Sequence, residues 1–133
     1  VIAPILGRLT PRLFIKSPFD GDLLSTDPDV GRAYENDPLR VIGATARLGM
    51  EMFRVMKVCN EQVARLRVPA MVVHGGDDPI VPPESTVPIG LQPSATRVVL
   101  DGLRHEVLNE PSWSDTVASL IAFADAELVP QSP

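Results

Sequence analysis

The sequence predicts an α/β fold, in which helices pack against a parallel sheet. Residues 70–74 and 97–101 are short and mainly apolar, as strands are when both faces of a parallel sheet are covered. Residues 75–96 between them are long enough for the crossover connection that parallel strands require. Apolar residues at helical spacing precede and follow this pair. The order helix, strand, crossover, strand, helix is typical of α/β proteins.

The composition indicates an ordinary soluble globular protein. The chain has 133 residues, of which 44% are hydrophobic and 22% are charged, so it is long enough to bury one core. Its net charge of -5 argues against binding to nucleic acid or to an anionic membrane surface. No apolar run approaches the roughly 20 residues that span a bilayer. The chain begins with Val1 and has no signal-peptide pattern, so we expect a further segment upstream.

The single cysteine, Cys59, excludes an internal disulfide and fits a reducing compartment. We therefore expect a cytoplasmic location. Because Cys59 lies on the apolar side of a predicted helix, we also expect its thiol to be buried and inert.

The first element with clear boundary signals is a helix that begins at Pro28. Residues 1–26 contain several prolines and predict irregular or short helical structure. Asp27 can cap the helix that follows, and a proline in the first helical position loses no hydrogen bond. The helix should end near Asn36, because Pro38 disfavours the helical conformation of the residue before it.

Residues 44–66 have the longest helical pattern. Their apolar residues recur at steps of three and four and form one stripe, which comprises Leu48, Met52, Val55 or Met56, Cys59, Val63 and Leu66. Two interpretations remain open: a helix packed on a core, or a mobile cover over an apolar pocket.

The crossover and the last helix complete the pattern. Prolines and a glycine in residues 88–93 leave room for only a brief helix after Pro83. The last helix should begin near Pro111 or Ser112 and end near Leu128. Two strands form too small a sheet to stand alone, so we expect their neighbours to lie outside this chain.

Two acidic residues and a histidine follow the two strands. Asp77 and Asp78 come after the first strand, and His105 comes after the second. The carboxyl ends of parallel strands meet at one edge of a sheet, so an aspartate and a histidine there can form the acid–base half of a catalytic relay. On their own these signals are weak, because aspartate is a common turn residue and a lone histidine after a strand is usually a hydrogen-bonded loop residue. His74, at the end of the first predicted strand, fits that loop role better than a catalytic one.

No nucleophile accompanies the predicted pair. The G-x-S-x-G turn of α/β-hydrolases is absent, and Ser94, Ser112 and Ser114 lack its flanking glycines. The sequence has neither metal-ligand spacing nor a glycine-rich phosphate loop, so we predict no metal and no cofactor.

The segments VPAMVVHGGDDPIVPPEST (residues 68–86) and VVLDGLRHEVLNEP (residues 98–111) resemble the C-terminal half of the monoacylglycerol lipase and lysophospholipase group of α/β-hydrolases. AYENDPL (residues 33–39) resembles a segment of their cap. The resemblance implies a partial α/β-hydrolase fold, with cap helices, the last two parallel strands and the C-terminal helix. Residues 1–66 would be the cap with its connecting helix, and residues 67–133 the C-terminal part of the core.

The resemblance also implies roles for individual residues. Asp78 corresponds to the acid of the catalytic triad and His105 to its base, while the serine would lie upstream of Val1. Three residues after the histidine would brace its loop: Glu106, Asn109 and Glu110. The apolar side of the cap would line an acyl-chain pocket.

The expected function is that of a serine ester hydrolase acting on monoacylglycerol or lysophospholipid substrates. Because the nucleophile is lacking, this chain alone should be inactive. The expected partners are a lipid-like ester and either the N-terminal half of the same fold or a second copy that covers the strands. The alternatives are a non-catalytic remnant that serves as an interaction partner, and another α/β-hydrolase activity such as that of a peptidase.

Overall fold

A computed structural model describes residues 3–16 and 20–128, which form two compact units. In the described range, the first unit comprises residues 3–16 and 37–65, and the second comprises residues 20–36 and 66–128. The chain therefore passes from one unit to the other more than once.

The first unit is built on the long helix α3. Its elements are α1 (Ala3–Leu9), β1 (Phe14–Lys16), β2 (Gly43–Thr45), α3 (Ala46–Gln62) and the 3-10 turn η2 (Val63–Arg65). β1 and β2 pair antiparallel, with Phe14 opposite Thr45. Thr45 caps α3, because its hydroxyl accepts a hydrogen bond from the Leu48 amide at 3.2 Å. The helix was predicted, whereas the pairing of two three-residue strands was not.

The apolar stripe of α3 is largely exposed in the described chain. The large apolar side chains with about half or more of their surface exposed are Leu48, Met52, Phe53, Val55 and Met56. The prediction that Cys59 is buried is wrong for this chain, since the residue is exposed. Helical spacing identified the apolar stripe of the helix, but α3 packs on α1 through Ala46 and Met50, and no described residue of the unit covers the stripe at Cys59.

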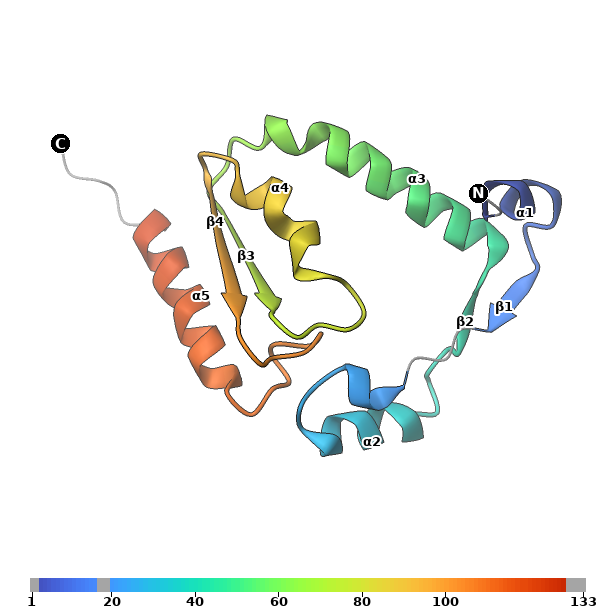
Figure 1. The fold of residues 1–133 in the computed structure, drawn as a ribbon, viewed down its shortest axis with the longest axis horizontal. Coiled ribbons are helices and arrows are strands. Elements are labelled where there is room, and N and C mark those ends of the chain that lie inside the picture. Colours follow the sequence, from blue (N-terminus) through green and yellow to red (C-terminus); the bar gives the residue numbers. More distant parts are fainter. Residues whose placement is uncertain (1–2, 17–19, 129–133) are drawn as a thin grey trace. The chain divides into compact units, whose positions relative to one another are not determined.

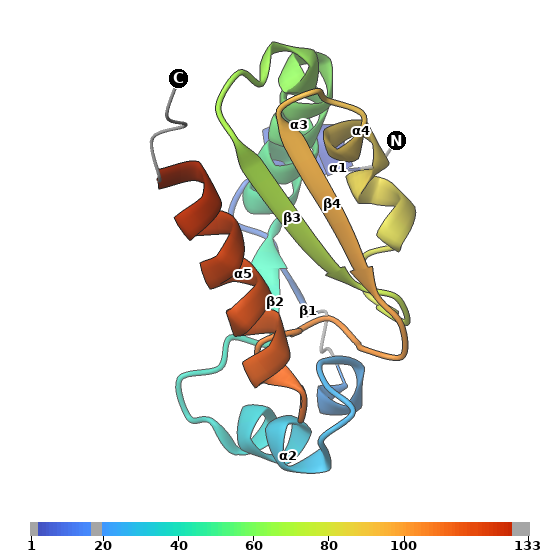
Figure 2. The ribbon, with the colours of Figure 1, turned by 90° about the vertical axis from the view of Figure 1, so that its left-hand side faces the viewer.

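The second unit contains the predicted parallel pair. Its elements are the 3-10 turn η1 (Gly21–Leu23), α2 (Pro28–Asn36), β3 (Ala70–Gly75), the 3-10 turn η3 (Pro83–Thr86), α4 (Val87–Gly90), β4 (Ala95–Leu100) and α5 (Trp113–Leu128). α4 and α5 lie on opposite sides of the strand pair (Figures 1 and 2). The helices, the strands and the brief crossover helix lie where the sequence predicts them, to within a few residues.

β3 and β4 run parallel, and Gly75 pairs with Leu100 at their carboxyl ends. The crossover between them is held to β4 by Arg97. Its Nε donates to the Thr86 hydroxyl at 2.9 Å, and its Nη2 donates to the Pro83 carbonyl at 2.7 Å. Because β3 and β4 are parallel, the two loops that follow them leave the sheet at the same edge. This edge carries the candidate site.

Residues 20–36 belong with the second unit rather than with the rest of the first 66 residues. α2 begins at Pro28 as predicted, and Asp27 accepts a hydrogen bond from the Asp29 amide at 2.9 Å. The Glu106 amide donates to the Leu24 carbonyl at 2.7 Å, and Leu24 is one of the buried apolar residues. The interpretation of residues 1–66 as a cap remains a prediction. None of the described helices has both the length and the apolar character needed to cross a membrane.

Candidate active site

Asp78 lies in the turn that follows β3, and its side chain is almost fully buried. The carboxylate Oδ1 accepts hydrogen bonds from the backbone amides of Ile80 at 2.8 Å and Val81 at 3.0 Å. An aspartate that bonds backbone amides a few residues ahead of it stabilises a tight turn. The same side chain therefore shapes the turn and presents its second oxygen, Oδ2, at the edge of the sheet.

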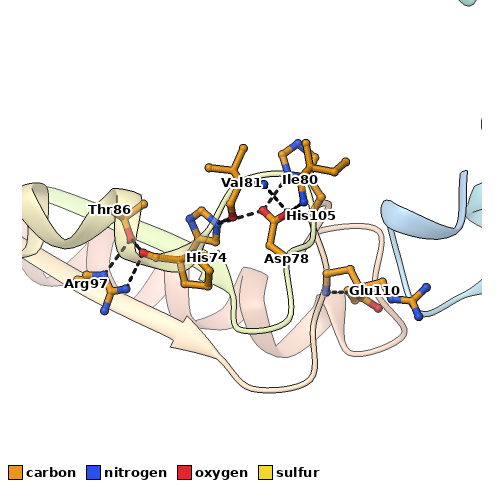
Figure 3. Close-up of polar contacts among 10 residues, drawn as sticks. His74, Asp78, Ile80, Val81, Thr86, Arg97, His105 and Glu110 are labelled. Atoms are coloured by element: carbon orange, nitrogen blue, oxygen red, sulfur yellow. Dashed lines mark hydrogen bonds and ion pairs between the residues drawn. The ribbon is translucent and has the colours of Figure 1, made fainter. Parts of the chain in front are cut away.

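His105 lies in the loop after β4 and contacts that second oxygen. Its Nδ1 is 2.8 Å from Asp78 Oδ2 (Figure 3). The imidazole is 37% exposed, whereas the carboxylate is 2% exposed. The structure thus brings together the two residues that the sequence singled out, and the acid is the more enclosed partner.

A glycine at the end of β3 allows this approach. A Cβ atom on Gly75 would lie 2.0 Å from the Arg104 carbonyl oxygen and 2.5 Å from that of Leu103. The Asp77 amide donates to the Leu103 carbonyl at 2.9 Å, which joins the acid turn to the histidine loop. The backbone before His105 therefore lies directly on the end of the strand that carries Asp78.

Glu110 holds the other side of the histidine loop. It is 1% exposed and accepts hydrogen bonds from the Arg104 amide at 2.6 Å and the Thr26 amide at 2.9 Å. The hydroxyls of Ser25 and Thr26 also donate to this carboxylate. Glu110 thus ties the residue before His105 to the segment that precedes α2, and so anchors the loop.

The environment favours the ionised form of both buried carboxylates. Burial raises the pKa of Asp78, but hydrogen bonds from Val81, His105 and Ile80, together with the charge of His105, outweigh it and lower the pKa overall. Burial likewise raises the pKa of Glu110, and hydrogen bonds from Thr26, Arg104 and Ser25 more than offset it. Asp78 can therefore act as an acceptor toward the histidine at neutral pH.

Sequence reasoning missed the contact of His74 with this site. His74 Nε2 lies 3.0 Å from Asp78 Oδ2 and 2.9 Å from the Val81 carbonyl oxygen. The sequence places His74 one residue before the end of β3, but it does not show that the turn after Gly75 returns the Asp78 carboxylate to this histidine. Among the described residues, no serine hydroxyl bonds His105 and no group of acidic, histidine or cysteine side chains could hold a metal ion.

The family of the chain follows from a comparison with protein families. The model of a family described as "Serine aminopeptidase, S33" matches residues 1–112. The chain belongs to this family. The Serine aminopeptidase, S33 match covers the first unit and the second unit as far as the histidine loop, and ends before α5.

Similar proteins place the chain among α/β-hydrolases. Monoacylglycerol lipase of Mycolicibacterium smegmatis is 32% identical over 114 residues, which cover 83% of this chain and 40% of that protein. Phospholipase YtpA of Bacillus subtilis is 29% identical over 125 residues, which cover 90% of this chain and 48% of that protein. The crystal structure of Paleococcus ferrophilus monoacylglycerol lipase superposes with a TM-score of 0.81 at 30% identity, over 90% of this chain and 48% of that chain.

These relatives confirm the predicted fold class and the resemblance to monoacylglycerol lipases. The chain has part of the α/β-hydrolase fold and is similar to lipases that share this fold. It spans less than half the length of the relatives that it matches.

Proposed function

We propose that Asp78 and His105 are the acid and base of a serine ester hydrolase that acts on monoacylglycerol or lysophospholipid substrates. The observation that carries this proposal is the 2.8 Å contact between His105 Nδ1 and Asp78 Oδ2, at the carboxyl ends of two adjacent parallel strands. Asp78 holds the proton of His105 on Nδ1, which leaves Nε2 as the basic nitrogen.

The reaction follows from this tautomer. His105 Nε2 takes the proton of a serine as the serine attacks the ester carbonyl, and then donates it to the departing alcohol. In the second half, Nε2 takes a proton from water as the water attacks the acyl-serine, and then returns it to the serine oxygen as the fatty acid is released. Asp78 stays ionised and stabilises the imidazolium that forms in each half.

The serine is proposed to come from a G-x-S-x-G turn outside these 133 residues, which contain none. Two features support a partner segment with the rest of the same fold. β3 and β4 form a sheet of only two strands, and the chain aligns with less than half of its relatives. A second copy of the chain could cover the strands but would supply no such turn.

An apolar pocket in the first unit supports an acyl-chain substrate. It encloses about 430 Å³ and is lined mainly by apolar side chains, among them Leu6, Ile15, Val41, Met52 and Phe53. Its volume lies within the roughly 300–1,000 Å³ of small-molecule sites. The names of the relatives, a monoacylglycerol lipase and a phospholipase, support the same substrate class.

A peptidase is the second candidate, because the matched family is described as a serine aminopeptidase. The two activities share the acid and the histidine. They differ in the group that leaves the acyl carbon, which is an alcohol for an ester and an amine for a peptide. Turnover of monoacylglycerol and of aminoacyl anilides by the same preparation separates them. Faster anilide turnover would favour the peptidase.

The protein expressed from its complete coding region provides the main test. We expect His105→Ala to abolish ester turnover, and Asp78→Asn to lower kcat by ~10⁴-fold, as a tautomer-reversing substitution does in a serine protease triad. An amide at position 78 would also direct a donor at groups that already donate. Near-wild-type rates in either variant would show that these residues are not the acid and base.

A fluorophosphonate probe, which reacts with activated serines, tests the position of the nucleophile. We expect no adduct on the 133-residue chain alone and one adduct on the protein expressed from the complete coding region. A specific adduct on any serine of this chain would overturn the proposal. A stop codon immediately upstream of the codon for Val1 would instead favour a non-catalytic remnant.

A further inference from the structure

His74 shares the carboxylate of Asp78 with His105, although the proposed reaction uses only His105. Its Nε2 lies 3.0 Å from Oδ2, the same oxygen that His105 Nδ1 contacts at 2.8 Å. Figure 3 shows both imidazoles directed at the carboxylate, one from the end of β3 and the other from the loop after β4. The His74 side chain is 11% exposed, so bulk water does not replace this contact.

The partners of His74 Nε2 determine where its proton lies. The nitrogen is 3.0 Å from Asp78 Oδ2 and 2.9 Å from the Val81 carbonyl oxygen. A carbonyl oxygen only accepts, and an ionised carboxylate only accepts. Nε2 must therefore carry a proton and donate it to both oxygens. His74 then acts as a hydrogen-bond donor at this site and not as a second base.

The Asp78 carboxylate is saturated with donors once His74 is included. Oδ1 accepts from the amides of Ile80 and Val81, and Oδ2 accepts from the two imidazoles. An ionised carboxylate has about four acceptor positions, so each is used. Rotation of the carboxylate would break the amide bonds at Oδ1 and the His74 bond at Oδ2 together.

Val81 closes a ring of contacts around this carboxylate. Its amide donates to Asp78 Oδ1, and its carbonyl accepts from His74. The position of His74 is therefore coupled to the same turn that positions the acid. Without His74, Oδ2 would keep His105 as its single described donor and would have an acceptor position open to water.

We propose that His74 is a positioning residue that fixes Asp78 Oδ2, through its Nε2–H, so that His105 keeps its proton on Nδ1. The hydrogen bonds stand independently of the reaction, whereas the consequence for turnover rests on the proposed function. His74 contacts neither nucleophile nor substrate in this arrangement and acts only through Asp78.

The test compares two substitutions of His74 in the protein expressed from its complete coding region. His74→Gln keeps an N–H donor at a similar reach, whereas His74→Leu fills similar space without a donor. Arg97→Met is the matched control. It removes two hydrogen bonds between β4 and the crossover that follows the Asp78 turn, and Arg97 bonds neither Asp78 nor His105. The imidazole signals that disappear in His74→Leu and in His105→Ala assign the two histidines in the spectra.

Two measurements separate positioning from general stability. In nitrogen-15 spectra, we expect the Nδ1–H tautomer of His105 in the wild type, His74→Gln and Arg97→Met, and a mixture of tautomers in His74→Leu. In ester hydrolysis, we expect kcat of His74→Leu to fall roughly ten- to hundredfold with KM little changed, the range set by one hydrogen bond to a charged group. His74→Gln should restore kcat to within about threefold of the wild type.

Two results would overturn the inference. One is an unchanged His105 tautomer in His74→Leu, with kcat no lower than in Arg97→Met. The other is a His74→Gln variant as impaired as His74→Leu, because the donor would then not be the property that matters. If the wild type hydrolyses no ester, the proposed function fails, and the tautomer spectra still decide whether His74 positions the pair.

Discussion

At the residue scale, the site depends on two buried carboxylates that accept several hydrogen bonds each. Asp78 bonds two backbone amides and two imidazoles, and Glu110 accepts hydrogen bonds from Arg104 in the histidine loop and from Ser25 and Thr26 before α2. A buried carboxylate is stable only with such partners, because loss of hydration must be offset. Each is therefore sensitive both to pH and to replacement by an amide.

We expect Glu110→Gln to lower the free energy of unfolding by about 1–3 kcal/mol near neutral pH, since the amide NH₂ would face existing donors. The folded-state pKa of Glu110 is lowered, so its stabilisation is full above its ordinary pKa of 4.5 and is lost as the pH falls through the folded value. The gap between wild type and variant should therefore narrow on acidification.

Urea unfolding at about pH 7 and about pH 3 measures this gap. Glu127→Gln, at an exposed position near the end of α5, is the control and should leave the urea midpoint unchanged. A gap that stays constant across the pH range would contradict the linkage between Glu110 and folding.

The contact between Asp78 and His105 could be anticipated, because both residues lie in loops after strands whose carboxyl ends share one edge, and the resemblance to monoacylglycerol lipases singled out Asp78 rather than Asp77. The contact of His74 could not, since the sequence does not show how tightly the chain turns after Gly75. The exposure of Cys59 was mispredicted because helical spacing shows which face is apolar and not whether another segment covers it.

At the element scale, the end of β3 and the histidine loop are in backbone contact. We expect Gly75→Ala to lower the free energy of unfolding by about 1–3 kcal/mol, because its Cβ would press on the Arg104 and Leu103 carbonyls. The loop would have to move away, so the nitrogen-15 signature of the His105–Asp78 contact should weaken as well.

Gly49→Ala is the matched comparison, within α3. Nothing lies within 4 Å of a Cβ placed there, and alanine favours a helix interior over glycine by about 1 kcal/mol. We therefore expect the free energy of unfolding to rise, as followed by circular dichroism in urea. Equal destabilisation by both substitutions would show that close approach at Gly75 is not the cause of its effect.

Elements with strong local signals were predicted well. α2 begins at Pro28 after Asp27, and α5 spans Trp113–Leu128, within two residues of its predicted bounds. The β1–β2 pair was missed, because three residues per strand provide too short a pattern and their pairing joins segments far apart in the sequence.

At the scale of the whole molecule, apolar side chains of α3 remain exposed in this chain. Contiguous exposed apolar surface favours association. We expect the 133-residue chain alone to self-associate, as measured by size-exclusion chromatography with light scattering. Met56→Glu, a change on the exposed apolar stripe, should reduce the associated fraction.

Lys57→Gln is the control for that experiment, because it makes the same change in net charge on the charged side of α3. It should leave the associated fraction unchanged. Equal effects of the two substitutions would indicate that net charge, and not the apolar stripe, governs association.

The interleaving of the two units has a consequence for chimaeras made with related hydrolases. Exchanging the first unit as one continuous block up to residue 66 would also replace residues 20–36, which include the donors of Glu110. A graft that respects the fold would exchange residues 1–19 and 37–65 as separate inserts and retain the host's intervening helix. Recombination libraries with breakpoints near residues 19, 36 and 65 should therefore yield more folded hybrids than libraries with a single breakpoint at residue 66.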